Sequence, residues 1–193
     1  MKTLLITGFE PFGGETINPS WEAVQRLPEV VGDYRLEKLR IPVVFGLAAQ
    51  KVLDYARQDK PDKILCVGQA GGRAGVTPEY IAINLRHASI DDNAGNRPQD
   101  VRICPHGPAG IFSTLPVRKM AQAAEVAGVK SAVSYSAGTF VCNDLLYSLL
   151  WELPEIPAGF VHVPFLPEQA KEGVPSMPLE DIITALTAMI RAL

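Results

Sequence analysis

Ser131-Ala-Val-Ser-Tyr-Ser-Ala-Gly-Thr-Phe-Val-Cys-Asn-Asp-Leu-Leu-Tyr147 is the stretch around which the chain is organised. A strand-like run over 132–135 leads into a turn at Gly138 and then into a helix that is expected to reach about Glu152. Cys142 lies at the junction, where the free N–H groups and positive dipole of a helix N-terminus lower a thiol pKa. The same N–H groups could bind an oxyanion. The pattern favours a cysteine nucleophile, and the alternative is a cysteine that only packs in the core.

Outward from this stretch, strand-like and helix-like runs alternate without a repeat or a linker. We expect strands at 4–7, 35–44, 64–67, 79–85, 132–135 and 159–163, and helices at 19–27, 47–58, 116–127, 142–152 and 179–192. Asn18 is the expected cap of the first helix, with Pro19 in its first turn. This order predicts one α/β domain over residues 1–193, with a largely parallel sheet between helices and a ligand site beyond the carboxyl ends of the strands.

Two features outside the regular elements also carry predictions. Segment 91–108 is polar and rich in Gly and Pro, which is typical of a loop that covers a site or contacts a partner subunit. Cys104 lies within it and is interpreted as incidental, whereas Cys66 lies in a buried strand and is expected to be core. The glycine-rich turn 8–14 lacks the Lys and Ser/Thr of a phosphate-binding loop and the spacing of a dinucleotide fingerprint, so we predict no nucleotide there.

The charge balance and the cysteines limit the possible partners and location. The 193 residues carry a net charge of -3, with a pI near 5.6, which argues against nucleic acid or an anionic membrane as the main partner. The three cysteines form neither a metal-ligand spacing nor an even disulfide framework, as suits a reducing compartment. The first apolar run is too short for a signal peptide, and no later run resembles a membrane span. We therefore expect a cytoplasmic protein that acts on a small neutral or peptide substrate.

The segment 134–143, Ser-Tyr-Ser-Ala-Gly-Thr-Phe-Val-Cys-Asn, resembles the active-site signature of the pyroglutamyl peptidase I (pyrrolidone carboxyl peptidase) family. Other segments resemble the same family in order along nearly the whole chain: Thr7–Gly14, Asn18–Trp21, Gly68–Gly72, Phe112–Pro116 and His162–Phe165. The resemblance implies a cysteine peptidase that removes N-terminal pyroglutamate. It also implies a three-layer sandwich with a mixed, largely parallel sheet, no metal or cofactor, and a homo-oligomer, commonly a tetramer.

A catalytic triad follows from the same resemblance. His162 interrupts the apolar run 160–165, where a buried imidazole needs a hydrogen-bond partner. Residue type alone favours a satisfied core histidine, and Glu79 alone could equally be a solvated charge. The family motif implies that His162 is the general base and that Glu79 orients it. His87 and His106 lie in or beside polar loop sequence and are expected to be solvated.

Aromatic residues in the turn 8–14 and next to Cys142 suggest how a small flat ring could bind, with Phe9 and Phe12 on one side of it and Phe140 on the other. Phe9 and Phe12 precede the first helix, and Phe140 and Val141 immediately precede the cysteine. A pyroglutamyl ring is compact and neutral, so it requires apolar walls and a few backbone hydrogen bonds. Gln69 resembles the family residue whose main chain contacts that ring. The alternative is that these phenylalanines are ordinary core residues without a ligand.

Two positions depart from the family pattern. Tyr80 follows the glutamate where relatives usually carry a basic residue, and Ser89 occupies the place of an arginine that helps to stabilise the oxyanion in relatives. Arg86 and Arg97 flank the second gap, and the backbone N–H of Cys142 remains as a donor, so we expect a working but slower enzyme. Two alternatives are a weakened relative that binds pyroglutamyl peptides without efficient turnover and, by fold-level analogy alone, a nucleoside phosphorylase-like enzyme.

Overall fold

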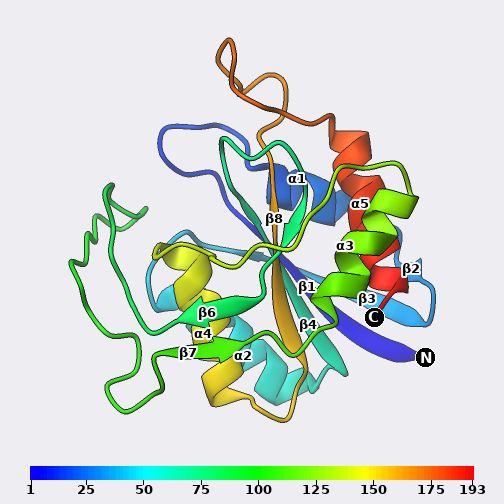
Figure 1. Ribbon diagram of the computed structural model, residues 1–193. Coiled ribbons are helices and arrows are strands. Elements are labelled where there is room, and N and C mark those ends of the chain that lie inside the picture. Colours follow the sequence, from blue (N-terminus) through cyan, green and yellow to red (C-terminus); the bar gives the residue numbers. More distant parts are fainter.

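The computed structural model describes residues 1–193 and contains a six-stranded sheet in the order β2-β3-β1-β4-β8-β5 (Figure 1). The strands are β1 Lys2–Phe9, β2 Val30–Val31, β3 Tyr34–Ile41, β4 Lys63–Gln69, β5 Thr77–Pro78 and β8 Ala158–Val163. The four strands β3, β1, β4 and β8 run parallel, and the two short edge strands β2 and β5 are antiparallel to their neighbours. The mixed, largely parallel sheet is therefore confirmed.

Helices cover both faces of this sheet. They are α1 Pro19–Arg26, α2 Leu47–Asp59, α3 Val117–Val126, α4 Val141–Glu152 and α5 Leu179–Arg191. One core lies between the sheet and α1, α3 and α5, and a second core lies between the sheet and α2 and α4. Alternate side chains of β4 enter opposite cores, since Leu65 packs in the first and Cys66 in the second. The three-layer sandwich is confirmed. No helix has the length and apolar character needed to cross a membrane.

The edge of the sheet next to β5 differs from the prediction. The expected strand 79–85 is broken, and only β6, Ile81–Ile83, is a strand, which pairs with β7, Gly110–Phe112, in a separate two-stranded sheet. The expected strand 132–135 makes only isolated bridges, including the one between Glu79 and Ser134. Its apolar residues do not fill a sheet face, because Tyr135 is exposed. The strand expected at 35–44 ends at Ile41, before Pro42, which lacks an N–H group for the ladder.

Side chains at the start of α4 fix this helix against its neighbours. The Asn143 amide exchanges hydrogen bonds with the backbone of Ile83 and also donates to the Leu85 carbonyl. The buried Asp144 carboxylate accepts from the backbone N–H of Gly46, at 2.7 Å, and from Arg86 Nε, at 2.7 Å. These contacts hold the N-terminus of α4 at the carboxyl ends of the parallel strands, where ligand sites of such sheets occur.

Gly8 allows α1 to pack directly on β1. A Cβ atom at this position would lie 2.7 Å from Trp21 Cα, a backbone atom that can move only if the helix moves. We expect Gly8→Ala to lower the free energy of unfolding by ~1–3 kcal/mol, the usual cost of overpacking. Gly110→Ala is the matched control, because its nearest contact would be the flexible Ile81 Cδ1 at 3.0 Å. Urea unfolding measures both values, and equal losses would contradict this role of Gly8.

Candidate active site

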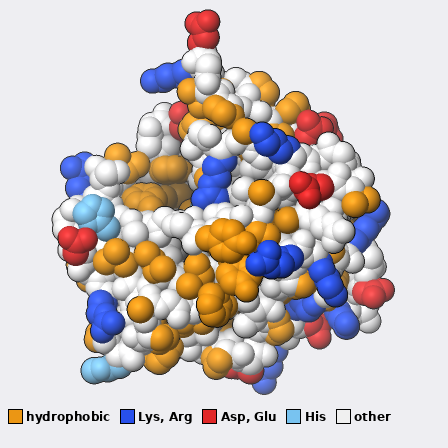
Figure 2. Space-filling model, viewed as in Figure 1, with side chains coloured by type: hydrophobic (Ala, Val, Ile, Leu, Met, Phe, Trp, Pro, Cys, Tyr) orange, Lys and Arg blue, Asp and Glu red, His pale blue; other side chains and the backbone are white.

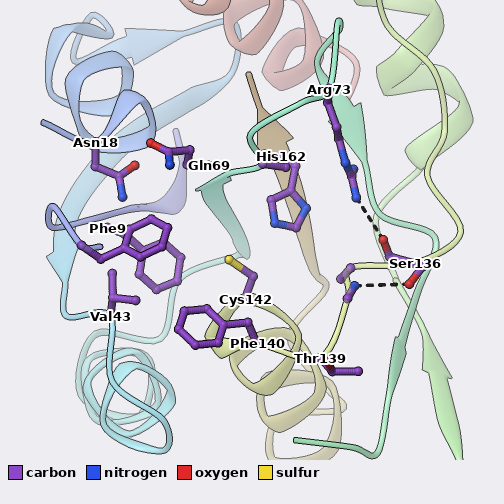
Figure 3. Close-up of a pocket in the computed structure, with 14 residues that line it drawn as sticks. Phe9, Asn18, Val43, Gln69, Arg73, Ser136, Thr139, Phe140, Cys142 and His162 are labelled. Carbon is purple, nitrogen blue, oxygen red and sulfur yellow. Dashed lines mark hydrogen bonds between the residues drawn. The ribbon is translucent and has the colours of Figure 1, made fainter. Parts of the chain in front are cut away.

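A cavity of about 440 Å³ opens beside the carboxyl ends of β1, β4 and β8 (Figure 3). It brings together six of the residues singled out from the sequence: Phe9, Phe12, Gln69, Phe140, Cys142 and His162. The other lining residues are Asn18, Val43, Ala70, Arg73, Ser136, Ala137, Gly138 and Thr139. Segments that are distant along the chain therefore surround one thiol and one imidazole.

Cys142 is the second residue of α4, and its sulfur lies over β4. The N-cap residue, Phe140, provides no side-chain hydrogen bond to the helix, so the N–H groups of the first turn have no capping side chain. A Cβ atom at residue 68 would lie 2.9 Å from Cys142 Sγ and 2.6 Å from the Phe160 ring. Glycine at position 68 therefore makes room for the sulfur.

The pKa of the Cys142 thiol is shifted in the direction opposite to the sequence-based expectation. Burial raises this pKa, and the negative charge of Glu79 raises it further. Both effects outweigh the helix terminus, which the sequence pattern had suggested would lower the pKa. The thiol is consequently a weak nucleophile until a base accepts its proton.

His162 and Glu79 form a buried hydrogen-bonded pair, with 2.7 Å between His162 Nδ1 and Glu79 Oε1. Burial raises the pKa of the Glu79 carboxyl, but the hydrogen bond and charge of His162 outweigh burial, and the net shift is downward. Burial lowers the pKa of the His162 imidazole, and this effect exceeds the opposite influence of Glu79. At neutral pH the carboxylate can only accept a hydrogen bond, so Nδ1 carries the proton and Nε2 is free to act as a base.

Arg73 is a site residue that the sequence analysis missed. Its Nη1 atom lies 2.6 Å from Glu79 Oε1 and also donates to Thr77 Oγ1. Its Nη2 atom donates to the Ser136 carbonyl at 3.0 Å. Arg73 thus links the carboxylate to the loop that leads into α4. The available signal was an arginine in the Gly-rich turn directly after β4, six residues before Glu79.

The two arginines that flank Ser89 do not line the cavity. Arg86 is paired with Asp144, and Arg97 forms an exposed pair with Asp91 at 2.7 Å. Ser89 itself is exposed. Neither arginine therefore lies where it could stabilise an oxyanion in the cavity, and Arg73 is the arginine that lines the cavity.

The end of the cavity away from Arg73 has mainly apolar walls. Figure 3 shows Phe9, Val43 and Phe140 on one side of Cys142, with Asn18 and Gln69 above them. Gln169, which the sequence analysis did not select, donates to Gln69 Oε1 at 3.2 Å and holds that side chain.

Asn18 has two roles here. It is the predicted cap of α1, since it accepts a hydrogen bond from the Ser20 N–H, and it also lines the cavity. Val141, by contrast, does not line the cavity, because the first turn of α4 directs its side chain into the core with α2.

The remaining predicted residues lie outside the cavity. His87 and His106 are exposed, and His87 pairs with Asp100. Cys66 is fully buried, and its burial raises the thiol pKa to about 12. Cys104 is half-buried. Segment 91–108 contributes no lining residue, so the expectation that it covers the site is not met.

Segment 91–108 nevertheless supports the cavity wall through hydrogen bonds. Asn93 donates to the Pro11 carbonyl and to Glu10 Oε1, and its N–H donates to the Val43 carbonyl. It thereby holds the turn that carries Phe12.

Comparison with known proteins identifies close relatives. A family model described as pyroglutamyl peptidase matches residues 1–193. The chain is 52% identical to the pyrrolidone-carboxylate peptidase of Levilactobacillus brevis, over 98% of this chain and 96% of that protein. It is 48% identical to the same-named protein of Escherichia fergusonii, over 100% and 94% of the two chains.

Solved structures agree with this result. Pyroglutamyl peptidase I of Bacillus amyloliquefaciens superposes with a TM-score of 0.96 at 43% identity, covering 100% of this chain and 96% of the other. Pyrrolidone carboxyl peptidase of Thermococcus litoralis gives a TM-score of 0.94 at 34% identity, with coverages of 100% and 93%.

We expect Arg73 to influence the pH dependence of kcat/KM. The pKa of His162 is lowered mainly by burial, and the positive charge of Arg73 lowers it further. If His162 is the base that accepts the thiol proton, it must be neutral to do so, and the acid limb of kcat/KM then follows its pKa in the free enzyme. Arg73→Gln removes the positive charge, which raises the His162 pKa and moves the acid limb to higher pH.

The control for this measurement is Arg57→Gln, on the exposed face of α2, which should leave the limb unchanged. A pH–rate profile that is the same in Arg73→Gln as in the parent, or that moves to lower pH, would show that Arg73 does not lower the pKa of His162.

Proposed function

Since the chain belongs to the pyroglutamyl peptidase family, we propose that Cys142, His162 and Glu79 carry out the family's reaction. The protein is a cysteine peptidase that hydrolyses the amide bond after an N-terminal pyroglutamyl residue. One observation supports this residue assignment above the others. A buried imidazole, held at 2.7 Å by a carboxylate, shares a cavity with a thiol at a helix N-terminus.

The pyroglutamyl ring is proposed to bind at the apolar end of the cavity. Phe9, Phe12 and Phe140 supply flat hydrophobic surfaces, and the rings of Phe12 and Phe140 lie 6.2 Å apart. The Gln69 backbone lies at the end of β4 and supplies the hydrogen bonds that a lactam requires. This placement puts the scissile carbonyl near Cys142 and the leaving amine on the His162 side.

Acylation begins with proton transfer from the Cys142 thiol to His162 Nε2. The sulfur then attacks the carbonyl carbon, and the first-turn N–H groups of α4 stabilise the oxyanion. The imidazolium gives its proton to the departing amine, and the C–N bond breaks to leave a thioester on Cys142. Glu79 stabilises the imidazolium during this step through the Nδ1 hydrogen bond.

Deacylation repeats these proton transfers, with water in place of the amine. His162 Nε2 accepts a proton from water, the hydroxide attacks the thioester, and the proton passes to the sulfur as pyroglutamate is released. Because the pKa of the Cys142 thiol is raised, the sulfur is a poor leaving group as a thiolate, and the proton from His162 lets it leave as a neutral thiol. Every proton passes through one imidazole.

We also infer a homotetramer and a cytoplasmic location. The assembly is suggested by the family resemblance, and the location by three free cysteines, which suit a reducing compartment. Residues 1–193 act as one catalytic domain in this proposal, with pyroglutamyl peptides as partners rather than nucleic acid or membrane. Light scattering of the purified protein measures the assembly, and a monomer would contradict it.

Single substitutions test the triad with a fluorogenic pyroglutamyl amide. Cys142→Ser and His162→Ala should each lower kcat/KM by at least about 10⁴-fold, because attack and proton transfer both fail. Glu79→Gln should cost less and leave measurable turnover, since an orienting group contributes less than the attacking group or the base.

The matched control is Glu155→Gln, which changes an exposed carboxylate before β8 and should retain full activity. Near-normal turnover in His162→Ala would refute the assignment of the base. A parent protein that binds the amide but does not cleave it would instead favour the weakened relative.

A further inference from the structure

The proposed mechanism fixes the direction in which the leaving peptide extends from the cavity. The ring occupies the side of Cys142 that carries Phe9 and Val43, and His162 protonates the departing amine. In Figure 3, Arg73 and Ser136 lie on the opposite side of His162 from those ring-binding residues. The residue that follows pyroglutamate must therefore pass over the loop that contains Ser136.

That loop borders a group of three aromatic residues, here called the aromatic patch: the exposed Phe112 and Tyr135 and the half-buried Tyr80. Tyr135 directly precedes Ser136 in the chain and is 60% exposed, and Phe112 is 62% exposed. The Tyr80 ring lies between them, with ring centroids 5.5 Å from Tyr135 and 5.4 Å from Phe112. Exposed aromatic clusters of this kind commonly mark binding surfaces.

A hollow of about 400 Å³ lies between the patch and the start of α3. Arg118 borders it, with its guanidinium 5.5 Å from the Tyr80 ring and its Nη2 atom 3.4 Å from the Tyr135 hydroxyl. Figure 2 shows a hollow on one face of the molecule, with hydrophobic side chains gathered beside it and Lys and Arg side chains next to them. Tyr135 directly precedes Ser136, which lines the cavity, so the aromatic patch and the cavity meet at this loop.

The backbone connects this patch rigidly to the catalytic residues. Tyr80 follows Glu79, and its N–H donates to the Ser134 carbonyl at 2.7 Å, while the Ser113 N–H donates to the Tyr80 carbonyl at 2.9 Å. Glu79 is buried beside His162, whereas the ring of the next residue, Tyr80, packs against Tyr135 in the patch. Tyr80 thus places an aromatic surface directly beside the buried Glu79.

We propose that the aromatic patch binds the side chain of the residue that follows pyroglutamate, and that it favours aromatic and large apolar side chains. The proposal rests on the proposed function, because the triad determines the direction of the leaving group. Stacking against Tyr135 and Tyr80 removes apolar surface from water and stabilises the acylation transition state. The preference is confined to acylation, since the leaving group has departed before the thioester is hydrolysed.

The test compares kcat/KM for pyroglutamyl-phenylalanine amide and pyroglutamyl-glycine amide. The parent should favour the phenylalanine substrate, and Tyr135→Ala and Phe112→Ala should each reduce that preference by about five- to tenfold, as expected from lost apolar contact. Activity on the glycine substrate should be unchanged. Tyr135→Phe should keep the preference because it keeps the ring.

The matched control is Val126→Ala, which removes an 83%-exposed apolar side chain at the end of α3 and should leave both substrates unaffected. An unchanged ratio in the alanine variants, or an equal loss on both substrates, would overturn the subsite while the proposed function stands. A change of assembled mass in light scattering without a change of ratio would identify the patch as a subunit contact and also overturn it. Failure of the parent to cleave either substrate would overturn both proposals.

Discussion

The buried carboxylate of Glu79 is the constraint on which the rest of the site depends. A carboxylate removed from water costs several kcal/mol unless charged or hydrogen-bonding groups compensate it. His162 and Arg73 both contact its Oε1 atom, at 2.7 and 2.6 Å. The main chain sets this geometry, because β5 pairs Thr77 with His162 and the Glu79 N–H donates to the Phe160 carbonyl. Two residues of edge strand are therefore enough to align the acid with the imidazole.

The thiol depends on this pair more than its position at a helix terminus would suggest. Burial makes the Cys142 proton difficult to remove, and the Glu79 charge adds to that difficulty. The same charge stabilises the imidazolium, so the carboxylate opposes a free thiolate but assists proton transfer to His162. The Cys142 thiol is half-buried at the cavity wall, and because its pKa is raised it depends on the base for activation.

The sequence predicted those features that arise from local periodicity or from short motifs. The buried run at 64–67, the Asn18 cap and the alternation of strands with helices were all readable because burial on a regular element leaves a periodic pattern. Features that depend on how distant segments of the chain pack together could not be predicted in this way. Arg73 contributes to the site only because its turn folds back onto Glu79 and Ser136, and the segment 132–135 has strand-like residues but passes the sheet edge with isolated bridges. The thiol pKa was misjudged because burial cannot be read from the position of a residue at a helix end.

The proposed mechanism requires Glu79 to hold His162 as the tautomer with its proton on Nδ1, which leaves Nε2 free as the base. Nitrogen-15 NMR of the histidine side chains measures this directly, with His162 assigned by comparison with His162→Ala. At neutral pH we expect a neutral ring protonated on Nδ1, and loss of that fixed tautomer in Glu79→Ala. A ring protonated on Nε2 in the parent protein would contradict the account, because that nitrogen could not then accept the Cys142 proton.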